Sequence, residues 1–271
     1  MIANGQNLIP LPVRAERTEG QFLIDRNTAI YNPDFPELTD YLNDHIEQLC
    51  RYRLPSREVP EQSRIVFEKG EGPSEGYALT VTPQRITIRG NDRGGAFYAL
   101  QTLFQLMPDD VYRTDESTTV REECGIPCYS IEDAPRFSYR GVMLDVSRTF
   151  FDKNTVLRYI DWLSRHKINT LHWHLSDDNG WRIEIKKHPE LTEKGAWRGP
   201  GEVLPPSYGS GNKRYGGYYS QEEIREIVRY AAFRNIEIIP EIDLQGHSQT
   251  LTSVYPETFC LSETSYPEEE M

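Results

Sequence analysis

The 271-residue sequence lacks long apolar runs, a cysteine framework and an excess of basic residues. Its apolar runs extend over only a few residues, whereas a membrane-spanning helix needs about 20, so we expect no membrane span. Thirty Lys and Arg residues against 42 Asp and Glu residues give a net charge of −12. A chain with this charge repels phosphate backbones and anionic lipid surfaces, so nucleic acid is not an expected partner.

Cysteine is sparse and scattered. Cys50, Cys124, Cys128 and Cys260 form no C-x-x-C motif. We expect four unpaired thiols, although a disulfide between Cys124 and Cys128 is an open alternative. The first residues have neither the basic nor the apolar region of a secretory signal. Such a start fits a cytosolic protein, and it fits equally an exported protein whose signal has been removed.

What the sequence does contain is the composition of a globular protein, with 37% hydrophobic and 27% charged residues. Its length predicts about two domains at roughly 150 residues each. Sixteen tyrosines and four tryptophans are prominent. Aromatic rings are surfaces on which sugars stack, but we expect most of them, including those near residues 178–219, to pack within the protein.

Residues 1–135 have an α+β pattern. Alternating apolar and polar residues predict strands over residues 63–68, 77–82 and 85–89. Apolar residues at helical spacing predict one helix over residues 38–49 and a second that begins after Asp92, a suitable N-cap, and ends at Met107. Residues 109–135 are polar and contain two prolines, which favours a linker.

Residues 136–271 alternate between strands and helices. Strands are predicted over residues 142–146, 168–175 and 236–242. One helix should follow Asp152 or Asn154, and another should follow the capping box at Ser220 and Glu223. A long insertion rich in Gly, Pro and Tyr separates the second strand from the second helix. This βαβαβ order predicts a parallel sheet with right-handed crossovers.

All three predicted parallel strands end in polar residues. The polar residues that follow them are Asp145 and Arg148, then His172, His174, Asp177 and Asp178, and finally Glu241, Asp243 and His247. In (β/α) barrels, functional residues gather at the carboxyl ends of the strands, so this arrangement predicts a site. Structural explanations stay open. Asp145 and Arg148 could form an ion pair, and either Asp177 or Asp178 could cap a loop.

The residue types allow two kinds of enzyme. A metal-dependent hydrolase would use the His-x-His pair, Asp177 and His247 as ligands for zinc or a two-metal centre. A glycosidase would use the same carboxylates and imidazoles to line a polar pocket for a sugar ring. The spacing alone does not decide between them.

Three segments together resemble glycoside hydrolase family 20, the β-N-acetylhexosaminidases. They are RGVMLDVSR at residues 140–148, HWHLSDDNGWR at residues 172–182 and PEIDLQGHS at residues 240–248. Residues 8–12, 75–77 and 101–103 are similar to the family's accessory domain. Gln245 stands where the family commonly has proline, which should affect the stiffness of the loop more than its chemistry.

The resemblance implies a two-part fold. Residues 1–135 would be an accessory α+β domain, and residues 136–271 would be about the first three strands of a (β/α)8 catalytic barrel. A complete barrel of this kind typically needs about 250 residues. Three parallel strands leave two open edges and an uncovered apolar face, so self-association is expected. Light scattering that showed a cooperatively melting monomer would contradict this expectation.

The resemblance also implies a mechanism without metal or cofactor. The acetamido oxygen of the substrate attacks the anomeric carbon, while a glutamic acid protonates the leaving oxygen and an adjacent aspartate holds the acetamido group. Asp177 and His247 would support that acid, with the imidazole relaying between Asp177 and the acid. The candidate substrate-binding residues are Arg140, His174, Asp145 and Glu241. Arg140 would bind sugar hydroxyls, although it lies at the start of its strand.

One part of the family's motif set is missing. The acid pair of the family stands in a His-x-Gly-Gly-Asp-Glu segment, whereas the Gly-Gly pairs here are followed by Ala96 and Tyr218. We therefore expect an N-terminal portion of an enzyme that removes terminal non-reducing GlcNAc or GalNAc from glycans or chitin oligosaccharides, and expect the chain itself to be inactive. A non-catalytic glycan-binding module is the alternative. The resemblance favours a periplasmic or secreted protein.

Overall fold

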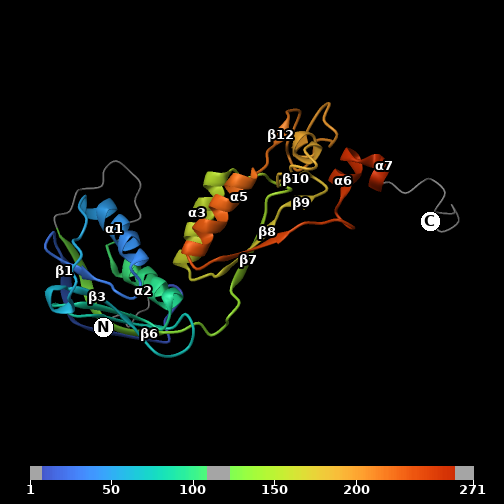
Figure 1. The fold of residues 1–271 in the computed structure, drawn as a ribbon. Coiled ribbons are helices and arrows are strands. Elements are labelled where there is room, and N and C mark those ends of the chain that lie inside the picture. The colour runs from blue at the N-terminus through green and yellow to red at the C-terminus, as the bar shows by residue number, and fades with distance from the viewer. Residues whose placement is uncertain (1–7, 109–122, 260–271) are drawn as a thin grey trace. The chain divides into compact units, whose positions relative to one another are not determined.

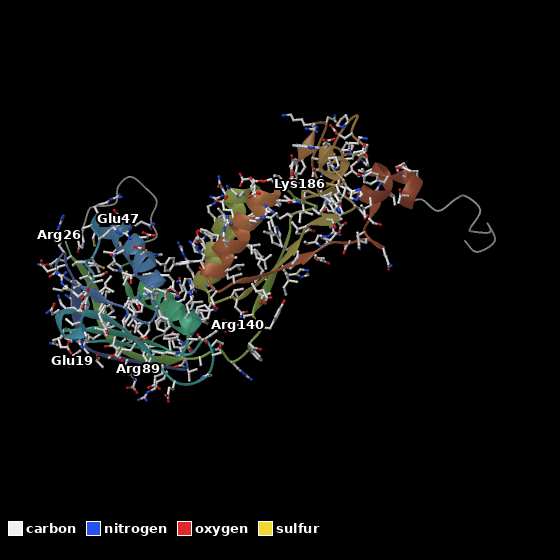
Figure 2. The ribbon with its side chains drawn as sticks, viewed as in Figure 1. Glu19, Arg26, Glu47, Arg89, Arg140 and Lys186 are labelled. Atoms are coloured by element: carbon white, nitrogen blue, oxygen red, sulfur yellow. The ribbon has the colours of Figure 1, made fainter. Side chains whose placement is uncertain are left out.

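The computed structural model describes residues 8–108 and 123–259. The chain divides into two compact units, Met1–Ser138 with Arg165–Lys167 and Tyr139–Ser164 with Ile168–Met271. Figure 1 shows the two units and Figure 2 adds their side chains. Within the described residues, no helix has the length and apolar character needed to cross a membrane.

The first unit contains a mixed six-stranded sheet with the order β1-β6-β4-β5-β3-β2. Its strands are β1 (Arg14–Ile24), β2 (Ile30–Tyr31), β3 (Ile65–Lys69), β4 (Tyr77–Val81), β5 (Ile86–Gly90) and β6 (Cys124–Asp133). Two helices, α1 (Glu37–Cys50) and α2 (Arg93–Leu106), and the short η1 (Pro60–Gln62) complete the unit. Alternate residues of β4 and β5 are buried, as the sequence pattern predicted.

Local signals in this unit are confirmed at two places. Strands β4 and β5 form an antiparallel hairpin whose turn is closed by the Thr82 N–H bonding the Arg85 carbonyl at 2.9 Å. The Asp92 side chain accepts a hydrogen bond of 2.8 Å from the Gly95 N–H and caps α2. Both features use short polar side chains or turn residues that can be recognised without knowledge of the tertiary fold.

The prediction of a linker over residues 109–135 is wrong for its second part. Residues 109–122 lie outside the described residues, but residues 124–133 form β6, which pairs with both β1 and β4. The eleven-residue strand β1 was not predicted at all. Among the cysteines within the described residues, no disulfide is present, so the alternative pairing of Cys124 with Cys128 is excluded, and Cys260 lies outside that part.

The second unit contains the predicted parallel sheet. Strands β7 (Gly141–Asp145), β8 (Thr170–His174) and β13 (Glu237–Glu241) pair in the order β13-β8-β7. Helices α3 (Lys153–Arg165) and α5 (Gln221–Phe233) cover one face. The core between helices and sheet contains Val156 and Ile160 from α3, Trp173 from β8 and Ile227 from α5.

Both long helices begin with the predicted caps. Asp152 accepts a 2.7 Å hydrogen bond from the Thr155 N–H at the start of α3. Ser220 and Glu223 form the reciprocal capping box at the start of α5. Short elements fill the insertion and the end of the chain: β9 (Ser176–Asp177), β10 (Gly180–Trp181), α4 (Glu190–Glu193), β11 (Trp197–Arg198), β12 (Tyr215–Gly216), α6 (Gln249–Val254) and α7 (Pro256–Phe259).

The second face of the parallel sheet is open. Met143 and Ile239, in the middle of the outer strands, are 51% and 40% exposed, whereas Trp173 on the helix-covered face is 1% exposed. The structure therefore shows a mixed α/β fold, and no closed barrel is present within the described residues. The eight-stranded barrel and the self-association of the open face stay predictions.

Candidate active site

The predicted strand-end residues lie in one row across the parallel sheet. Asp145 ends β7, His174 ends β8 and Glu241 ends β13, and the strand register places their Cα atoms opposite one another. Because parallel strands run the same way, equal positions bring these side chains to one edge of the sheet. The row is completed by Asp177 of β9, which follows β8 after a single residue.

His174 is buried and has a carboxylate at each ring nitrogen. Its Nδ1 lies 2.6 Å from Glu241 Oε2, and its Nε2 lies 2.8 Å from Asp177 Oδ2. Two carboxylate acceptors favour the doubly protonated ring, since each nitrogen then donates. Arg148 Nη1 lies 3.1 Å from the same Nε2, but it does not bond a protonated nitrogen, because both groups are then donors.

The pKa values of His174 and Glu241 shift in opposite directions. Burial disfavours the charge on His174, but the hydrogen bonds to Glu241 and Asp177 outweigh it and raise the pKa of the imidazole. Burial likewise opposes ionisation of Glu241, but the hydrogen bond and charge of His174, aided by His172, lower the pKa of the carboxyl. Glu241 Oε2 also lies 2.7 Å from His172 Nε2. Both shifts favour charged side chains at the strand ends.

Arg148 joins the ends of the first two strands. Its Nη1 donates to Asp145 Oδ2 at 2.9 Å, and its Nη2 lies 2.6 Å from Asp177 Oδ2. Asp145 Oδ1 accepts from the backbone N–H groups of Ser147 and Arg148, which fixes the loop that carries the guanidinium. Burial opposes the charge of Arg148, but the two aspartates raise its pKa. The ion pair between Asp145 and Arg148, which the sequence left open, is present, but Arg148 also contacts Asp177.

Asp177 is the centre of the cluster, although only 1% of its side chain is exposed. Its Oδ2 is shared by His174 and Arg148, and its Oδ1 accepts a 2.7 Å hydrogen bond from the Asp178 N–H. A buried carboxylate with a cation and several donors around it is held in a single orientation.

His247 lies beside Asp177 without forming a short hydrogen bond. Its Nδ1 is 3.5 Å from Asp177 Oδ1 and 3.6 Å from Asp178 Oδ2, and 61% of its side chain is exposed. The residue adopts a left-handed backbone conformation with φ of 51°. The structure thus brings the two predicted supporting residues together, and the relay role of His247 stays a prediction.

Arg140 is the one candidate that the structure does not bring to this row. It precedes β7, and its backbone carbonyl accepts from the Thr170 N–H at the amino end of β8. Five residues of extended chain, about 16 Å, separate it from Asp145. Figure 2 shows Arg140 at the opposite end of the strands from the insertion, where Lys186 is labelled. Sugar binding by Arg140 stays a prediction.

The sequence reasoning missed the site role of Arg148 and His172. Both residues belong to the polar residues at the predicted strand ends, but Arg148 was considered as an ion-pair partner of Asp145 and His172 as half of a His-x-His metal-ligand pair, not as sugar-site residues. The signal that could have found Arg148 is its position three residues after the strand end, where the chain turns back over the cluster. Strand alternation places His172 on the same face as His174 and Glu241, and this is the signal for its position in the site.

Two buried arginines hold the loops that carry the cluster. Arg182 is fully buried and donates to the carbonyls of Val146 at 3.0 Å and Ser147 at 2.6 Å, and also to those of Ala196, Gly217 and Asn179. Arg198 is 1% exposed and donates to the Arg148 carbonyl at 2.9 Å. Burial, with the neighbouring Arg198, lowers the pKa of Arg182 to about 10. A side chain at Gly180 would collide with this guanidinium.

Within residues 8–108 and 123–259, two groups of side chains have metal-ligand types. They are His174 with Glu241 and Asp243, and Asp177 with Asp178 and His247, and the possible ligand atoms of each group lie within 4.8 Å of one another. In each group one carboxylate is already paired, Glu241 with His174 and Asp177 with Arg148. A divalent cation would have to displace those pairs, so the geometry gives the metal-hydrolase hypothesis no support beyond the residue types.

Comparison with known proteins covers almost the whole chain. Residues 137–270 match the model for the catalytic domain of glycosyl hydrolase family 20, and residues 5–134 match domain 2 of the same family. A β-hexosaminidase of Vibrio furnissii is 37% identical over 93% of this chain, and an N,N'-diacetylchitobiase of Vibrio harveyi is 43% identical over 89%. The chain spans 39% and 27% of the length of these two relatives.

A solved structure agrees with these sequence matches. The exo-β-N-acetylglucosaminidase of Vibrio harveyi, in complex with N-acetylglucosamine, superposes with a TM-score of 0.85 at 36% identity. The superposition covers 98% of this chain and 41% of the other. The family matches extend over both units, and they show that the chain belongs to glycoside hydrolase family 20, the family of the β-N-acetylhexosaminidases.

Proposed function

We propose that these 271 residues supply the strand-end half of the sugar site of a β-N-acetylhexosaminidase. The reaction is the hydrolysis of terminal non-reducing N-acetyl-β-hexosamine residues, with retention of configuration and with the substrate's acetamido oxygen as nucleophile. The observation that carries the proposal is the row of Asp145, His174 and Glu241, bonded through Asp177 and Arg148 into one charged cluster.

The cluster supports this chemistry because its charges are fixed before a ligand arrives. An oxazolinium intermediate carries positive charge, so a site for it needs carboxylates that are held in place and not free to reorganise. Asp177 and Glu241 meet this need, since His174 bonds both of them. Arg148 is the guanidinium that lies at the strand ends, and we therefore assign contact with sugar hydroxyls to Arg148 in addition to the predicted Arg140.

The chain also lacks two groups that the mechanism needs. The family's Gly-Gly-Asp-Glu segment supplies the general acid and the carboxylate that holds the acetamido group, and no such segment occurs in these 271 residues. Supporting residues do not replace a proton donor at the leaving oxygen, because the donor must stand within hydrogen-bond reach of that oxygen. We therefore expect the 271-residue chain to bind the sugar weakly and to leave the glycosidic bond intact.

The test measures turnover and binding on the same purified chain. We expect no release of nitrophenol from nitrophenyl β-N-acetylglucosaminide above the buffer rate. Calorimetric titration with N-acetylglucosamine should give a Kd of about 1 mM, as for a pocket with few contacts. Asp177→Asn should weaken this binding at least roughly tenfold, because the charge that His174 and Arg148 share is lost. The matched control is Glu226→Gln, which removes an exposed carboxylate of α5 that is paired with Lys153 of α3.

The outcomes separate this proposal from its alternatives. Hydrolysis at rates typical of a complete relative would contradict the expected inactivity. A wild-type chain that did not bind N-acetylglucosamine, or bound it equally well after Asp177→Asn, would contradict the site. Binding of about 1 μM without turnover would instead favour the glycan-binding module, whose pocket must be complete within these residues.

A further inference from the structure

The insertion between β8 and α5 carries aromatic rings that the structure divides into two kinds. Trp181 and Tyr219 are buried, and the Arg214 guanidinium covers the ring of Trp197 at 3.7 Å. These rings pack within the protein, as the sequence analysis expected for most of them. Tyr208 is different, since 67% of it is exposed, and Tyr218 is 40% exposed. An exposed aromatic ring has not been used for packing and is available to a ligand.

The backbone that carries Tyr208 is tied to the site. Tyr208 has a φ of 48°, which is uncommon for a tyrosine, and Gly209 follows with a φ of 73°. The Ser207 hydroxyl accepts a 2.9 Å hydrogen bond from Asn179 Nδ2, and Asn179 belongs to the turn that directly follows Asp177 and Asp178. The Ser210 N–H in turn donates to the Ser207 carbonyl at 3.1 Å. The tyrosine is therefore presented on a closed loop.

A cation beneath the ring gives a second link to the cluster. The Arg198 guanidinium lies 6.0 Å from the centre of the Tyr208 ring, and its Nη1 donates to the Arg148 carbonyl at 2.9 Å. Arg148 is the guanidinium that joins Asp145 to Asp177. A cation near an aromatic face attracts the ring and restricts its motion. Tyr208 is thus connected to the charged row on both sides, through Asn179 and through Arg198.

We propose that Tyr208 is an aromatic platform for a second sugar ring, next to the sugar held by the strand-end cluster. The ligand class is a β-linked oligosaccharide of N-acetylhexosamine with at least two units. The apolar C–H face of a pyranose packs on a ring of this kind, while the phenol hydroxyl remains hydrated. The inference rests on the proposed function, because it adds a neighbouring contact to that same site and makes Tyr208 a determinant of chain-length preference.

The experiment compares one sugar with two. N-acetylglucosamine and N,N'-diacetylchitobiose are titrated into the 271-residue chain and into Tyr208→Ala, Tyr208→Phe and Tyr218→Ala. We expect the wild type to bind the disaccharide more tightly than the monosaccharide. Tyr208→Ala should weaken disaccharide binding roughly fivefold and leave monosaccharide binding unchanged. Tyr208→Phe, which keeps the ring, and Tyr218→Ala, a matched exposed tyrosine of the same insertion, should behave as the wild type does.

Each other result overturns the platform in a distinct way. If Tyr208→Ala weakened both sugars equally, Tyr208 would act on the loop and not on the second ring. If Tyr218→Ala cost as much as Tyr208→Ala, the effect would belong to the insertion as a whole. Equal wild-type affinity for the two sugars would overturn the platform alone, whereas no affinity for either would overturn the proposed function together with it. Circular dichroism of each variant confirms that the fold is retained.

Discussion

At the scale of single residues, His174 decides the charge state of the site. The ring is buried between two carboxylates, and a protonated ring donates to both of them, which offsets the cost of burying its charge. The raised pKa of His174 and the lowered pKa of Glu241 are two expressions of this one contact. The contact should therefore be visible in the stability of the protein.

We expect the free energy of unfolding to depend on pH through this pair. A raised folded-state pKa for His174 gives stabilisation that is complete below the ordinary histidine value of about 6.5 and is lost as the pH rises through the raised value. The lowered pKa of Glu241 gives stabilisation that is present above about 4.3 and is lost as the pH falls through the lowered value. The pair therefore contributes most at mildly acidic pH.

Urea unfolding between pH 5 and pH 9 measures this dependence. The wild type should lose stability on the alkaline side, and His174→Gln should be less stable at pH 6 and show a flatter alkaline limb. His166→Gln, at an exposed position outside the cluster, is the matched control and should keep the wild-type slope. Parallel curves for wild type and His174→Gln would mean that the imidazole carries no extra proton in the folded state.

The site could be predicted from the sequence only in part. Asp145, His174 and Glu241 were found because strand ends are recognisable from alternation, and equal positions on parallel strands meet at one edge. The position of Arg148 after a strand end places it near the site, but its interaction with Asp177 was not predictable, because it depends on how the loop after β7 folds back. Arg140 has the opposite problem, since its sequence distance from Asp145 is small but an extended strand separates the two in space.

At the scale of secondary-structure elements, Arg182 joins pieces that are distant along the chain. It bonds the carbonyls of Val146 and Ser147 after β7 and those of Ala196 and Gly217 in the insertion. These carbonyls come from loops and would otherwise need water or strand partners. The arginine has no carboxylate partner among the described residues, so its role is to satisfy backbone groups.

Replacing this side chain should be strongly destabilising. We expect Arg182→Met to lower the free energy of unfolding by at least about 3 kcal/mol, because several buried carbonyls lose their donors at once. Arg229→Met, at an exposed position of α5, is the matched control and should change stability by less than about 0.5 kcal/mol. Chemical denaturation compares the two. A loss below about 1 kcal/mol for Arg182→Met would show that water replaces the guanidinium.

Strands with clear alternation were predictable, whereas β1 and β6 were not, for physical reasons. Most residues of β1 are exposed, so residues 14–21 give no alternating pattern. The register of β1 against β6 also shifts between Arg17 and Gln21. In β6, Pro127 suggested a linker, but it lies in the half of the strand that pairs with β1 alone. A proline is tolerated where one side of a strand is unpaired.

At the scale of the whole molecule, residues of the charged cluster lie on the open face of the parallel sheet. Three strands covered by helices on one side leave the opposite face exposed, and the side chains of His172 and Glu241 belong to that face together with the apolar Met143 and Ile239. The sequence predicted this sheet, since its βαβ order is visible in the pattern. The chain spans 39% and 27% of the length of the two relatives compared above.

The central claim is that the strand-end cluster is an N-acetylhexosamine site, and a crystal structure of the chain soaked with N-acetylglucosamine tests it most directly. Our account predicts a pyranose ring at the carboxyl ends of β7, β8 and β13, with hydroxyls or the acetamido group within hydrogen-bond distance of Arg148 and Asp177. A sugar bound elsewhere on the chain, or a cluster that stays without sugar at saturating concentration, would contradict it.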